Sequence, residues 1–348
     1  MSNKAALLQS EKGEWTVGEV DIPTLGEGEV LVKVHACAIQ PADSKVAKQA
    51  IFKMEYPTTL GSPVGGTVEA LGEGTTNKVS IGDRIVCSTK IFSQKKAKYG
   101  GLQQYTVVDE SEVIEIGNID FRLAVTLGSN TPPAALFGPK ALNMRRPTIP
   151  ASPLPDSEAA KKIVIWGGSS AMGSLSISHA KQAGYTVIST SSPHNFDLLK
   201  SLGADYVYDH SDPDTIPKIR DLFPIDYWFD TISLPSTLST IFKILTPEDQ
   251  PVTKAHILLL LPPSYPGMPT PPEGITLQFH LFSTKAPENA EWQKWALSRG
   301  GYLEQAIKSG ALKGVPADVI GGLEKVSDGI DAVHAGVSGK KVVIEPWA

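Results

Sequence analysis

Three small residues, Gly168, Ser170 and Gly173, follow a short apolar run at a spacing that suits a phosphate-binding turn. The run Ile163–Trp166 is rich in β-branched residues, which is typical of a strand buried on both faces. Small residues let the backbone approach a pyrophosphate, and the N–H groups of the first turn of a following helix point at the anion. The spacing is that of the dinucleotide motif G-x-G-x-x-G with serine at the middle position. Taken alone, it also fits a strand–turn–helix without a ligand.

The end of the next apolar strand, Tyr185–Ser189, indicates which dinucleotide to expect. The residues that continue it, Thr190–Asn195, contain no carboxylate, and the next one along the chain is Asp197. An NAD site usually has an Asp or Glu there to bind the ribose 2′-hydroxyl. Hydroxyl, imidazole and amide groups instead donate hydrogen bonds to a 2′-phosphate without repelling it. The sequence therefore favours NADPH over NADH.

The elements around this turn alternate between strands and helices. Apolar runs predict strands at 163–166, 185–189, 206–208, 225–230 and 256–261. Helical spacing predicts helices at 174–184, 196–202, 214–222 and 237–245. Such alternation is typical of a Rossmann fold, an α/β domain with a doubly wound parallel sheet.

The part of the chain before residue 121 is rich in short strands instead. Strand patterns cover Lys4–Leu8, Trp15–Val20 and Glu29–Ala38, with Gly and Pro between them. Further glycine turns lead into strands within 79–86 and 98–108. Many short strands with glycine corners predict a partly open β-barrel. A helical stretch over Ala286–Ser309 and a last strand at Lys340–Ile344 complete the chain.

Composition sets the remaining bounds. A chain of 348 residues is long enough for two domains. We place the barrel at 1–126 and 286–348, and the dinucleotide-binding domain at 127–285. The net charge of −5, with no basic run longer than Lys95-Lys96, argues against a nucleic-acid partner. The absence of a leader or a long apolar run predicts a cytoplasmic protein that does not enter a membrane.

Several motifs together resemble the medium-chain dehydrogenase/reductase superfamily. Within it, the chain is similar to the zinc-independent branch of quinone oxidoreductases and, above all, fungal trans-enoyl reductases that serve polyketide synthases. Gln40–Lys45 resembles the Asn-Pro-x-Asp-x-Lys motif of that branch, and Leu60–Val68 resembles Leu-Gly-x-Asp-x-Ala-Gly-x-Val. Ser191–Asn195 and Gly336–Val343 match the enoyl-reductase group. The resemblance implies a GroES-like partly open β-barrel catalytic domain beside the Rossmann domain, with substrate bound between them.

The chain departs from the zinc-dependent alcohol dehydrogenases at both of their metal-binding motifs. Those enzymes have a Cys where Pro41 lies and a Gly-His-Glu motif where this chain has Gly61-Ser-Pro63. A catalytic zinc needs three protein ligands around an open position. No other cluster of Cys, His or Glu replaces them, so we expect no metal.

The resemblance also assigns two catalytic candidates, Lys45 and Thr131. Lys45 would lie near the nicotinamide ribose, position the cofactor and donate a hydrogen bond to a developing oxyanion. The alternative is a solvated lysine on a short helix. Thr131 would contact nicotinamide and substrate at the start of a helix. It would equally serve as an N-cap ahead of Pro132.

The remaining site residues are expected to bind NADPH. Ser169–Met172 would cover the pyrophosphate, and Ser192, His194 and Asn195 would contact the 2′-phosphate. His210 stands where many relatives have Tyr. The complete expected cofactor site consists of Asp43, Ser44, Lys45, Gly168, Ser169, Ser170, Ala171, Met172, Gly173, Ser191, Ser192, His194, Asn195, His210, Thr231, Ile232, Val337 and Ser338.

The function that follows is NADPH-dependent reduction of an activated C=C bond in an enoyl thioester or enone. Hydride would reach the β-carbon, and a proton would then reach the α-carbon. The substrate would be a small molecule or carrier-bound, with a polyketide synthase as partner, and the protein would be a monomer or homo-oligomer. Quinone reduction is the alternative within the same chemistry. A cofactor-binding protein without reductase activity is another alternative, and Gly167–Ala171 also resembles the nucleophile elbow of a serine hydrolase.

Overall fold

The computed structural model describes residues 2–76, 78–247, 254–279 and 282–348, and the chain divides into two compact units. The first unit consists of Met1–Ser129, Gln293–Gly310 and Pro316–Ala348. The second consists of Asn130–Trp292 and Ala311–Val315. The sequence places its domain boundaries after residues 126 and 285, and these stay predictions.

The second unit is built on a six-stranded sheet in which all neighbouring strands are parallel. The strands are β8 Lys162–Trp166, β9 Thr186–Ser191, β10 Tyr206–Asp209, β11 Tyr227–Asp230, β12 Ala255–Leu259 and β13 Ile275–Phe279. Their order is β10-β9-β8-β11-β12-β13, so the chain reverses direction across the sheet between β8 and β11. This confirms the predicted doubly wound sheet.

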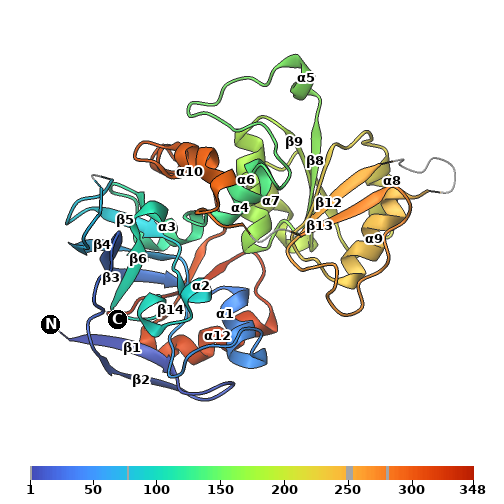
Figure 1. Ribbon diagram of the computed structural model, residues 1–348. Coiled ribbons are helices and arrows are strands. Elements are labelled where there is room, and N and C mark those ends of the chain that lie inside the picture. Colours follow the sequence, from blue (N-terminus) through green and yellow to red (C-terminus); the bar gives the residue numbers. More distant parts are fainter. Residues whose placement is uncertain (1, 77, 248–253, 280–281) are drawn as a thin grey trace. The chain divides into compact units, whose positions relative to one another are not determined.

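Helices cover both faces of that sheet. The helices of the second unit are α4 Thr131–Phe137, α5 Asp156–Ala159, α6 Ala171–Gln182, α7 Phe196–Leu202, α8 Thr215–Arg220 and α9 Pro235–Leu245, and α5 lies on a loop away from the sheet (Figure 1). Figure 1 shows α6 and α7 on one face and α8 and α9 on the other. Because both faces are covered, the central strands are largely apolar, and Val164, Trp228 and Ile257 are almost fully buried.

Strand β13 was not predicted. It lies at the edge of the sheet, soon after a proline-rich loop at residues 262–272, and only Ile275 of its five residues is buried. An edge strand of this kind carries neither a continuous apolar run nor a strict alternation. Its pairing with β12 defines it instead.

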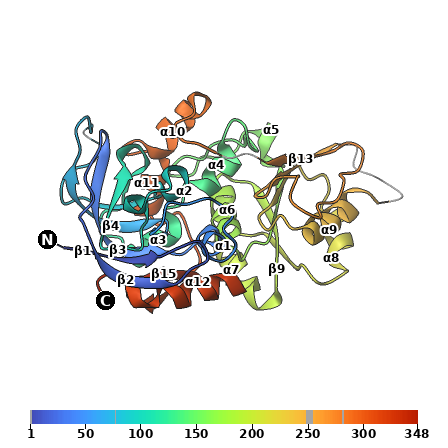
Figure 2. The same cartoon turned by 60° about the horizontal axis from the view of Figure 1, so that its bottom comes forward.

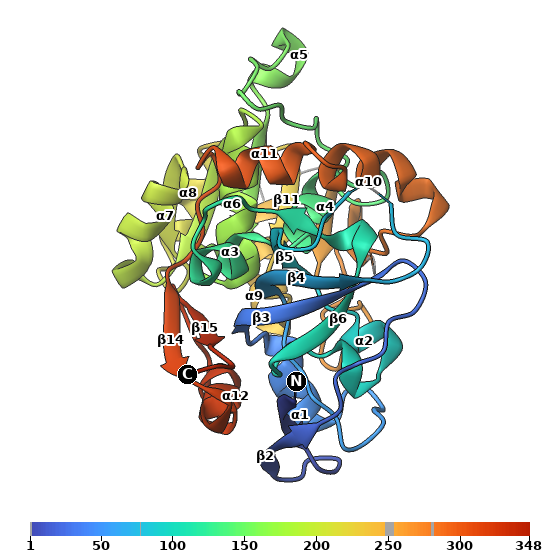
Figure 3. The same cartoon turned by 90° about the vertical axis from the view of Figure 1, so that its left-hand side faces the viewer.

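The first unit contains a seven-stranded sheet and a separate two-stranded one. The strands are β1 Asn3–Leu8, β2 Trp15–Val20, β3 Glu29–Ala38, β4 Val64–Leu71, β5 Arg84–Cys87, β6 Tyr105–Asp109, β7 Ile114–Glu115, β14 Ala317–Gly321 and β15 Lys341–Ile344. The larger sheet runs β14-β15-β3-β4-β5-β7, with β6 also paired to β3. Figure 2 shows the β1–β2 pair, and Figure 3 shows β3 between β4 and β6. The edge strands of the larger sheet, β14 and β7, do not pair with each other, so the barrel is partly open, as predicted.

The helices of the first unit connect its strands along the chain. They are α1 Pro41–Gln49, α2 Ile91–Gln94, α3 Phe121–Leu127, α11 Tyr302–Lys308 and α12 Val326–Ala335, and α10 Ala290–Leu297 precedes α11 across the unit boundary. Helices α1 and α12 pack against each other (Figure 3). The helical stretch predicted over 286–309 is in fact interrupted. Gly300 has a φ of +67°, and Gly301 forms the N-cap of α11.

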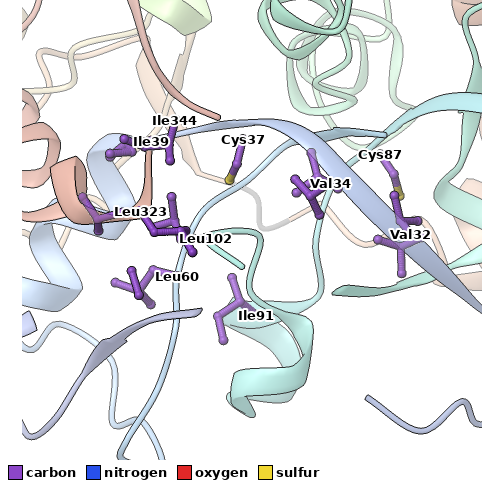
Figure 4. Packing of buried hydrophobic residues seen from close by; sticks show 14 of the residues in the cluster. Val32, Val34, Cys37, Ile39, Leu60, Cys87, Ile91, Leu102, Leu323 and Ile344 are labelled. Atoms are coloured by element: carbon purple, nitrogen blue, oxygen red, sulfur yellow. The ribbon is translucent and has the colours of Figure 1, made fainter. Parts of the chain in front are cut away.

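The core of the first unit joins strands, loops and α2. Figure 4 shows Cys37, Leu60, Ile91 and Leu102 in it, and each is fully buried. Gly61 lies against this cluster with a φ of +97°, and a Cβ there would be 2.6 Å from the Cys37 sulfur. Packing therefore requires glycine in the loop that follows Leu60. None of the described helices is long and apolar enough to cross a membrane.

Candidate active site

The turn between β8 and α6 has the backbone geometry that its glycines predict. Gly167 has a φ of +80°, a conformation that favours glycine. A Cβ on Gly173 would lie only 2.4 Å from the Gly167 carbonyl oxygen and 2.8 Å from the Gly168 Cα. A Cβ on Gly168 would lie 2.2 Å from Ser189 Oγ. Two of the three motif positions therefore require glycine, for close packing of helix on strand.

Ser170, at the middle position of the motif, is the N-cap of α6. Its hydroxyl oxygen accepts a hydrogen bond from the Gly173 N–H at 2.9 Å, which satisfies one of the free donors of the helix. The helix begins at Ala171, three residues before its predicted start at 174. The apolar periodicity marks only the buried turns of α6, whereas the cap determines where the helix starts.

A hydroxyl pair connects this turn to the end of β11. Ser170 Oγ lies 3.0 Å from Thr231 Oγ1, and Thr231 also donates to the Trp166 carbonyl oxygen at 2.7 Å. Strands β8 and β11 are the neighbours at which the sheet changes direction, and α/β proteins bind ligands at that crevice. The fold thus brings the predicted residues Gly168–Gly173, Thr231 and Ile232 together.

Asp230, the last residue of β11, fixes the backbone turn on the β11 side of this crevice. The sequence analysis did not identify it. It is fully buried, and its Oδ1 accepts from the N–H groups of Ile232 at 3.0 Å and Ser233 at 2.8 Å. Burial raises the pKa of the Asp230 carboxyl, although these hydrogen bonds oppose the shift. The carboxylate thereby shapes the turn that presents Thr231. An Asp at the end of a strand was the available signal.

The first turn of α6 can receive an anion. Within the described part of the chain, no hydrogen bond uses the N–H groups of Ala171 and Met172, and both residues are only partly buried. The dipole of this 12-residue helix adds positive potential at the same end. A pyrophosphate fits these donors.

The ends of β9 and β10 bring a second group of predicted residues together. Ser192 Oγ lies 3.3 Å from His210 Nε2, and Asn195 Nδ2 lies 3.2 Å from His194 Nε2. Ser192, His194 and His210 are partly or fully exposed. Ser191 is 1% exposed and Asn195 is 6% exposed, so these two side chains are largely inside the unit.

One carboxylate that the sequence reading missed also stands at this corner. Asp209 pairs with Ser191 across the β9–β10 ladder and precedes His210. Its Oδ1 accepts from the Ser211 N–H at 2.9 Å and the Ser211 hydroxyl at 2.7 Å. These hydrogen bonds lower the pKa of Asp209. The sequence analysis considered only the end of β9, whereas the strand beside it contributes to the same corner.

Helix α1 carries the predicted residues of the first unit. Asp43 is fully buried and accepts from the Gln40 N–H at 2.7 Å and the Gly61 N–H at 2.9 Å. Ser44, 2% exposed, donates to the Pro41 carbonyl oxygen at 2.9 Å. Both side chains therefore build the start of α1 from inside. Lys45 differs, because its side chain is partly exposed and its ammonium has no partner among the described residues.

A buried lysine completes the inner side of α1, and sequence reasoning did not identify it. Lys341 of β15 is 6% exposed and donates to Gln40 Oε1 at 2.6 Å. Burial lowers the pKa of Lys341 to about 8, against the attraction of Asp43. Burial likewise raises the pKa of Asp43 to about 6, against its two hydrogen bonds and Lys341. The motif at Gly336–Val343 contained this residue, but its burial depends on the pairing of β15 with β3.

The other predicted residues stand at the starts or ends of helices. Thr131 is exposed and is the first residue of α4, whose N-cap is Asn130. The alternative role of Thr131 as the N-cap is therefore wrong. Val337 and Ser338 follow α12, and Val337 packs partly against the core of the first unit.

No group of three or more His, Cys, Asp or Glu side chains in the described ranges could hold a metal ion. The positions where zinc alcohol dehydrogenases have ligands contain Pro41, Ser62 and Pro63. Ser62 accepts a hydrogen bond from the Thr89 N–H at 3.0 Å. The Ser62 hydroxyl thus binds the backbone of a neighbouring loop.

Comparisons with known proteins agree with this geometry. Residues 26–118 match the alcohol dehydrogenase GroES-like domain, and residues 171–254 match the family described as zinc-binding dehydrogenase. The chain is 30% identical to dehydrogenase azaJ of Aspergillus niger over 99% of both proteins. It is 31% identical to trans-enoyl reductase himH of Aspergillus japonicus over 91% of this chain and 89% of the relative.

Solved structures show the same fold. A quinone oxidoreductase of Pseudomonas syringae is 18% identical and superimposes with a TM-score of 0.72, over 99% of this chain and all of that one. An alcohol dehydrogenase superfamily protein of Novosphingobium aromaticivorans is 19% identical with a TM-score of 0.75, over 99% of both chains.

Proposed function

Because the chain belongs to the medium-chain dehydrogenase/reductase superfamily of oxidoreductases, we propose that it reduces an activated C=C bond with NADPH. The observation that carries this proposal is the turn at the β8–β11 crevice. There, Gly168 and Gly173 are required by packing, and Ser170 joins Thr231. When bound, NADPH supplies the hydride.

The second unit would bind the cofactor through two sets of donors. The N–H groups of Ala171 and Met172 hold the pyrophosphate at the start of α6. Ser192, His194 and His210 donate hydrogen bonds to the 2′-phosphate. Their hydroxyl and imidazole groups support NADPH over NADH, and Asp209 is occupied by Ser211.

Lys45 and Thr131 are the proposed substrate residues. Reduction of an enoyl thioester puts negative charge on the thioester oxygen as the β-carbon accepts hydride. A cation with a free donor stabilises that oxyanion. The Lys45 ammonium meets this requirement, because it has no partner in the described part of the chain. Thr131 orients the substrate from the start of α4.

The reaction would proceed without zinc. Pro41, Ser62 and Pro63 replace the residues that carry the metal in zinc alcohol dehydrogenases. The oxyanion is then stabilised by hydrogen bonds alone. Enoyl reduction is preferred over quinone reduction because the relatives near 30% identity include trans-enoyl reductases, such as himH and tndF of Aspergillus flavipes. A polyketide synthase is the partner that this reading implies.

The deciding experiment titrates the pure protein with NADPH and with NADH, following nucleotide fluorescence. We expect NADPH to bind at least about tenfold more tightly, since a 2′-phosphate adds charge-assisted hydrogen bonds. Turnover is then measured with crotonyl-N-acetylcysteamine and with 1,4-naphthoquinone. Equal or absent binding of both nucleotides would overturn the proposal, and binding without turnover would indicate a cofactor-binding protein.

A pair of lysine variants on α1 tests the catalytic assignment. Lys45→Ala should lower kcat about 100-fold or more, in the range that loss of one oxyanion donor produces. The matched control is Lys48→Ala, because Lys48 lies on the same helix and pairs with Asp331 instead. Equal kcat in both variants would remove Lys45 from the chemistry.

A further inference from the structure

Two segments of the first unit form a surface that the proposed reduction does not use. One follows α1, and the other comprises α2 and the residues after it. They meet where the rings of Phe52 and Phe92 lie 6.0 Å apart between centroids. We call the whole the Phe52 surface, and it consists of Ile51, Phe52, Lys53, Phe92, Lys95 and Lys96.

The apolar part of the Phe52 surface is more exposed than packing requires. Ile51 is 44% exposed and Phe52 is 40% exposed, although they are consecutive and large. Ala50, the C-cap of α1, has a φ of 54°, so the chain leaves the helix in a tight turn there. Phe92 lies partly buried against the core, and its ring contacts that of Phe52. Clustered exposed apolar side chains of this kind mark binding sites, whereas single ones do not.

The charged part of the Phe52 surface is cationic. Lys53, Lys95 and Lys96 are all exposed, and none of them forms an ion pair with another residue that the structure describes. Glu55 is also exposed and offsets one of these charges. The chain as a whole has a net charge of −5, so this local excess of positive charge is unlike the average surface.

Two lysines near α2 in the sequence, Lys90 and Lys98, differ from Lys95 and Lys96 because they form ion pairs with carboxylates. Lys90 and Lys98 lie 2.9 Å and 3.1 Å from the carboxylate of buried Glu29. Burial alone would raise the pKa of Glu29, but hydrogen bonds from Lys90, Tyr99, the Gly26 N–H and Lys98 lower it to about 2. Lys90 also lies 3.6 Å from the carboxylate of Asp109, so the charges of Lys90 and Lys98 are balanced by those of Glu29 and Asp109. The charges of Lys95 and Lys96 remain available outside the fold.

We infer that the Phe52 surface docks the carrier domain that presents the enoyl thioester, through an acidic and partly apolar face of that domain. This inference rests on the proposed enoyl reduction. Opposite charges would steer the encounter, and Phe52 and Ile51 would be covered on contact. The surface begins two residues beyond α1, the helix that carries Lys45. The path along the chain from Lys45 to Ile51 is about 10 Å at the helical rise, so a partner on this surface would be close to Lys45 in sequence. Exposed lysines on the same two segments as exposed apolar side chains fit a protein partner better than a polyphosphate.

The test compares a tethered substrate with a free one. The tethered probe is the crotonyl-loaded acyl carrier domain from each of several fungal polyketide synthases, and the free probe is neutral crotonyl-N-acetylcysteamine. We expect a higher kcat/KM for at least one tethered probe, and this advantage should fall as salt rises from 50 to 500 mM. The variant Lys53→Glu/Lys95→Glu/Lys96→Glu should lose about tenfold or more on the tethered probe only.

Two further variants separate docking from catalysis and from net charge. Phe52→Ser should also weaken turnover of the tethered probe, because it removes apolar contact without changing charge. The control Lys4→Glu/Lys200→Glu/Lys243→Glu changes the net charge equally at exposed lysines elsewhere and should behave as wild type.

The outcomes distinguish this inference from the proposed function. Turnover of the free thioester with no advantage for any carrier domain, or equal losses in both triple variants, would overturn docking while leaving the reductase intact. Preferential binding of the Phe52 surface to anionic phospholipid vesicles would also overturn it. Failure to reduce either probe would instead refute the enoyl reduction itself.

Discussion

Ser170 Oγ lies 3.0 Å from Thr231 Oγ1, and this contact ties the first turn of α6 to the end of β11. The same oxygen caps α6 by accepting from the Gly173 N–H at 2.9 Å. A glycine at this position would leave the crevice open but would supply neither contact. Ser170 therefore fixes this turn with two side-chain contacts, at a position where the motif usually has a glycine.

Ser170→Ala should lower the free energy of unfolding by about 1 kcal/mol, the usual effect of losing an N-cap side chain. Ser170→Gly should be less harmful to the helix, since glycine is a tolerable N-cap, and should still bind NADPH. Urea denaturation followed by circular dichroism measures both. Ser201→Ala, at an exposed serine of α7, is the control. An unaltered midpoint in Ser170→Ala would show that the cap contributes nothing.

Gly173→Ala should damage the turn, whereas a replacement at a glycine with open space around it should not. The new Cβ would meet the Gly167 carbonyl oxygen at 2.4 Å and the Gly168 Cα at 2.8 Å, and both are backbone atoms. Overpacking of this kind costs about 1–3 kcal/mol and would distort the phosphate-binding donors. We expect NADPH affinity to fall at least tenfold in isothermal titration calorimetry.

Gly18→Ala is the matched control for that variant, because no heavy atom lies within 4 Å of the Cβ it adds. It should bind NADPH as the wild type does. Similar affinities in the two variants would contradict the packing argument.

Asp43 should give the first unit a pH-dependent stability. Because burial raises its folded-state pKa from 3.8 to about 6, the folded state keeps a proton that the unfolded state loses between these values. Wild-type stability should therefore decline as pH rises from about 4 to 6, by up to about 3 kcal/mol. Lys341, with its pKa lowered to about 8, titrates above this window.

Asp43→Asn removes that titration and one of the two acceptors for the Gln40 and Gly61 N–H groups. It should be destabilised by about 1–3 kcal/mol, and more at pH 4 than at pH 6.5. Urea midpoints at both pH values measure the difference. Asp21→Asn, at an exposed aspartate, should show no such trend. A penalty that grows with pH would mean that the folded-state pKa is not raised.

Ser192→Asp should reverse the nucleotide preference. It adds a carboxylate beside His210, at the end of β9 where NAD sites bind the ribose hydroxyls. Repulsion of the 2′-phosphate should weaken NADPH about tenfold to a hundredfold, while NADH binds as well or better. Fluorescence titration measures both, with Ser201→Asp as the control of equal charge. Unchanged NADPH affinity would place the 2′-phosphate elsewhere.

Much of the fold could be predicted because its signals are local. The strands at 15–20 and 29–38 and the helix at 196–202 have the predicted bounds, since apolar periodicity and flanking glycines act over a few residues. The turn after Trp166 was equally predictable, because the spacing of Gly168, Ser170 and Gly173 is a local pattern, although the side chain that excludes a Cβ at Gly168 is that of Ser189 on the neighbouring strand. The prediction of one continuous helix over 286–309 failed at Gly300 and Gly301, two adjacent glycines that lie between α10 and α11.

The sequence by itself determined the order of strands and helices, the small-residue turn, and the lack of a carboxylate after β9, because each depends on neighbours along the chain. Only the tertiary structure decided that Lys341 is buried against Gln40, 301 residues away, and that Asp43 lies in the same interior. It also made Ser170 a partner of Thr231 and brought Asp209 beside Ser191. Burial and long-range hydrogen bonds arise from the pairing of distant strands, and no local pattern encodes that pairing.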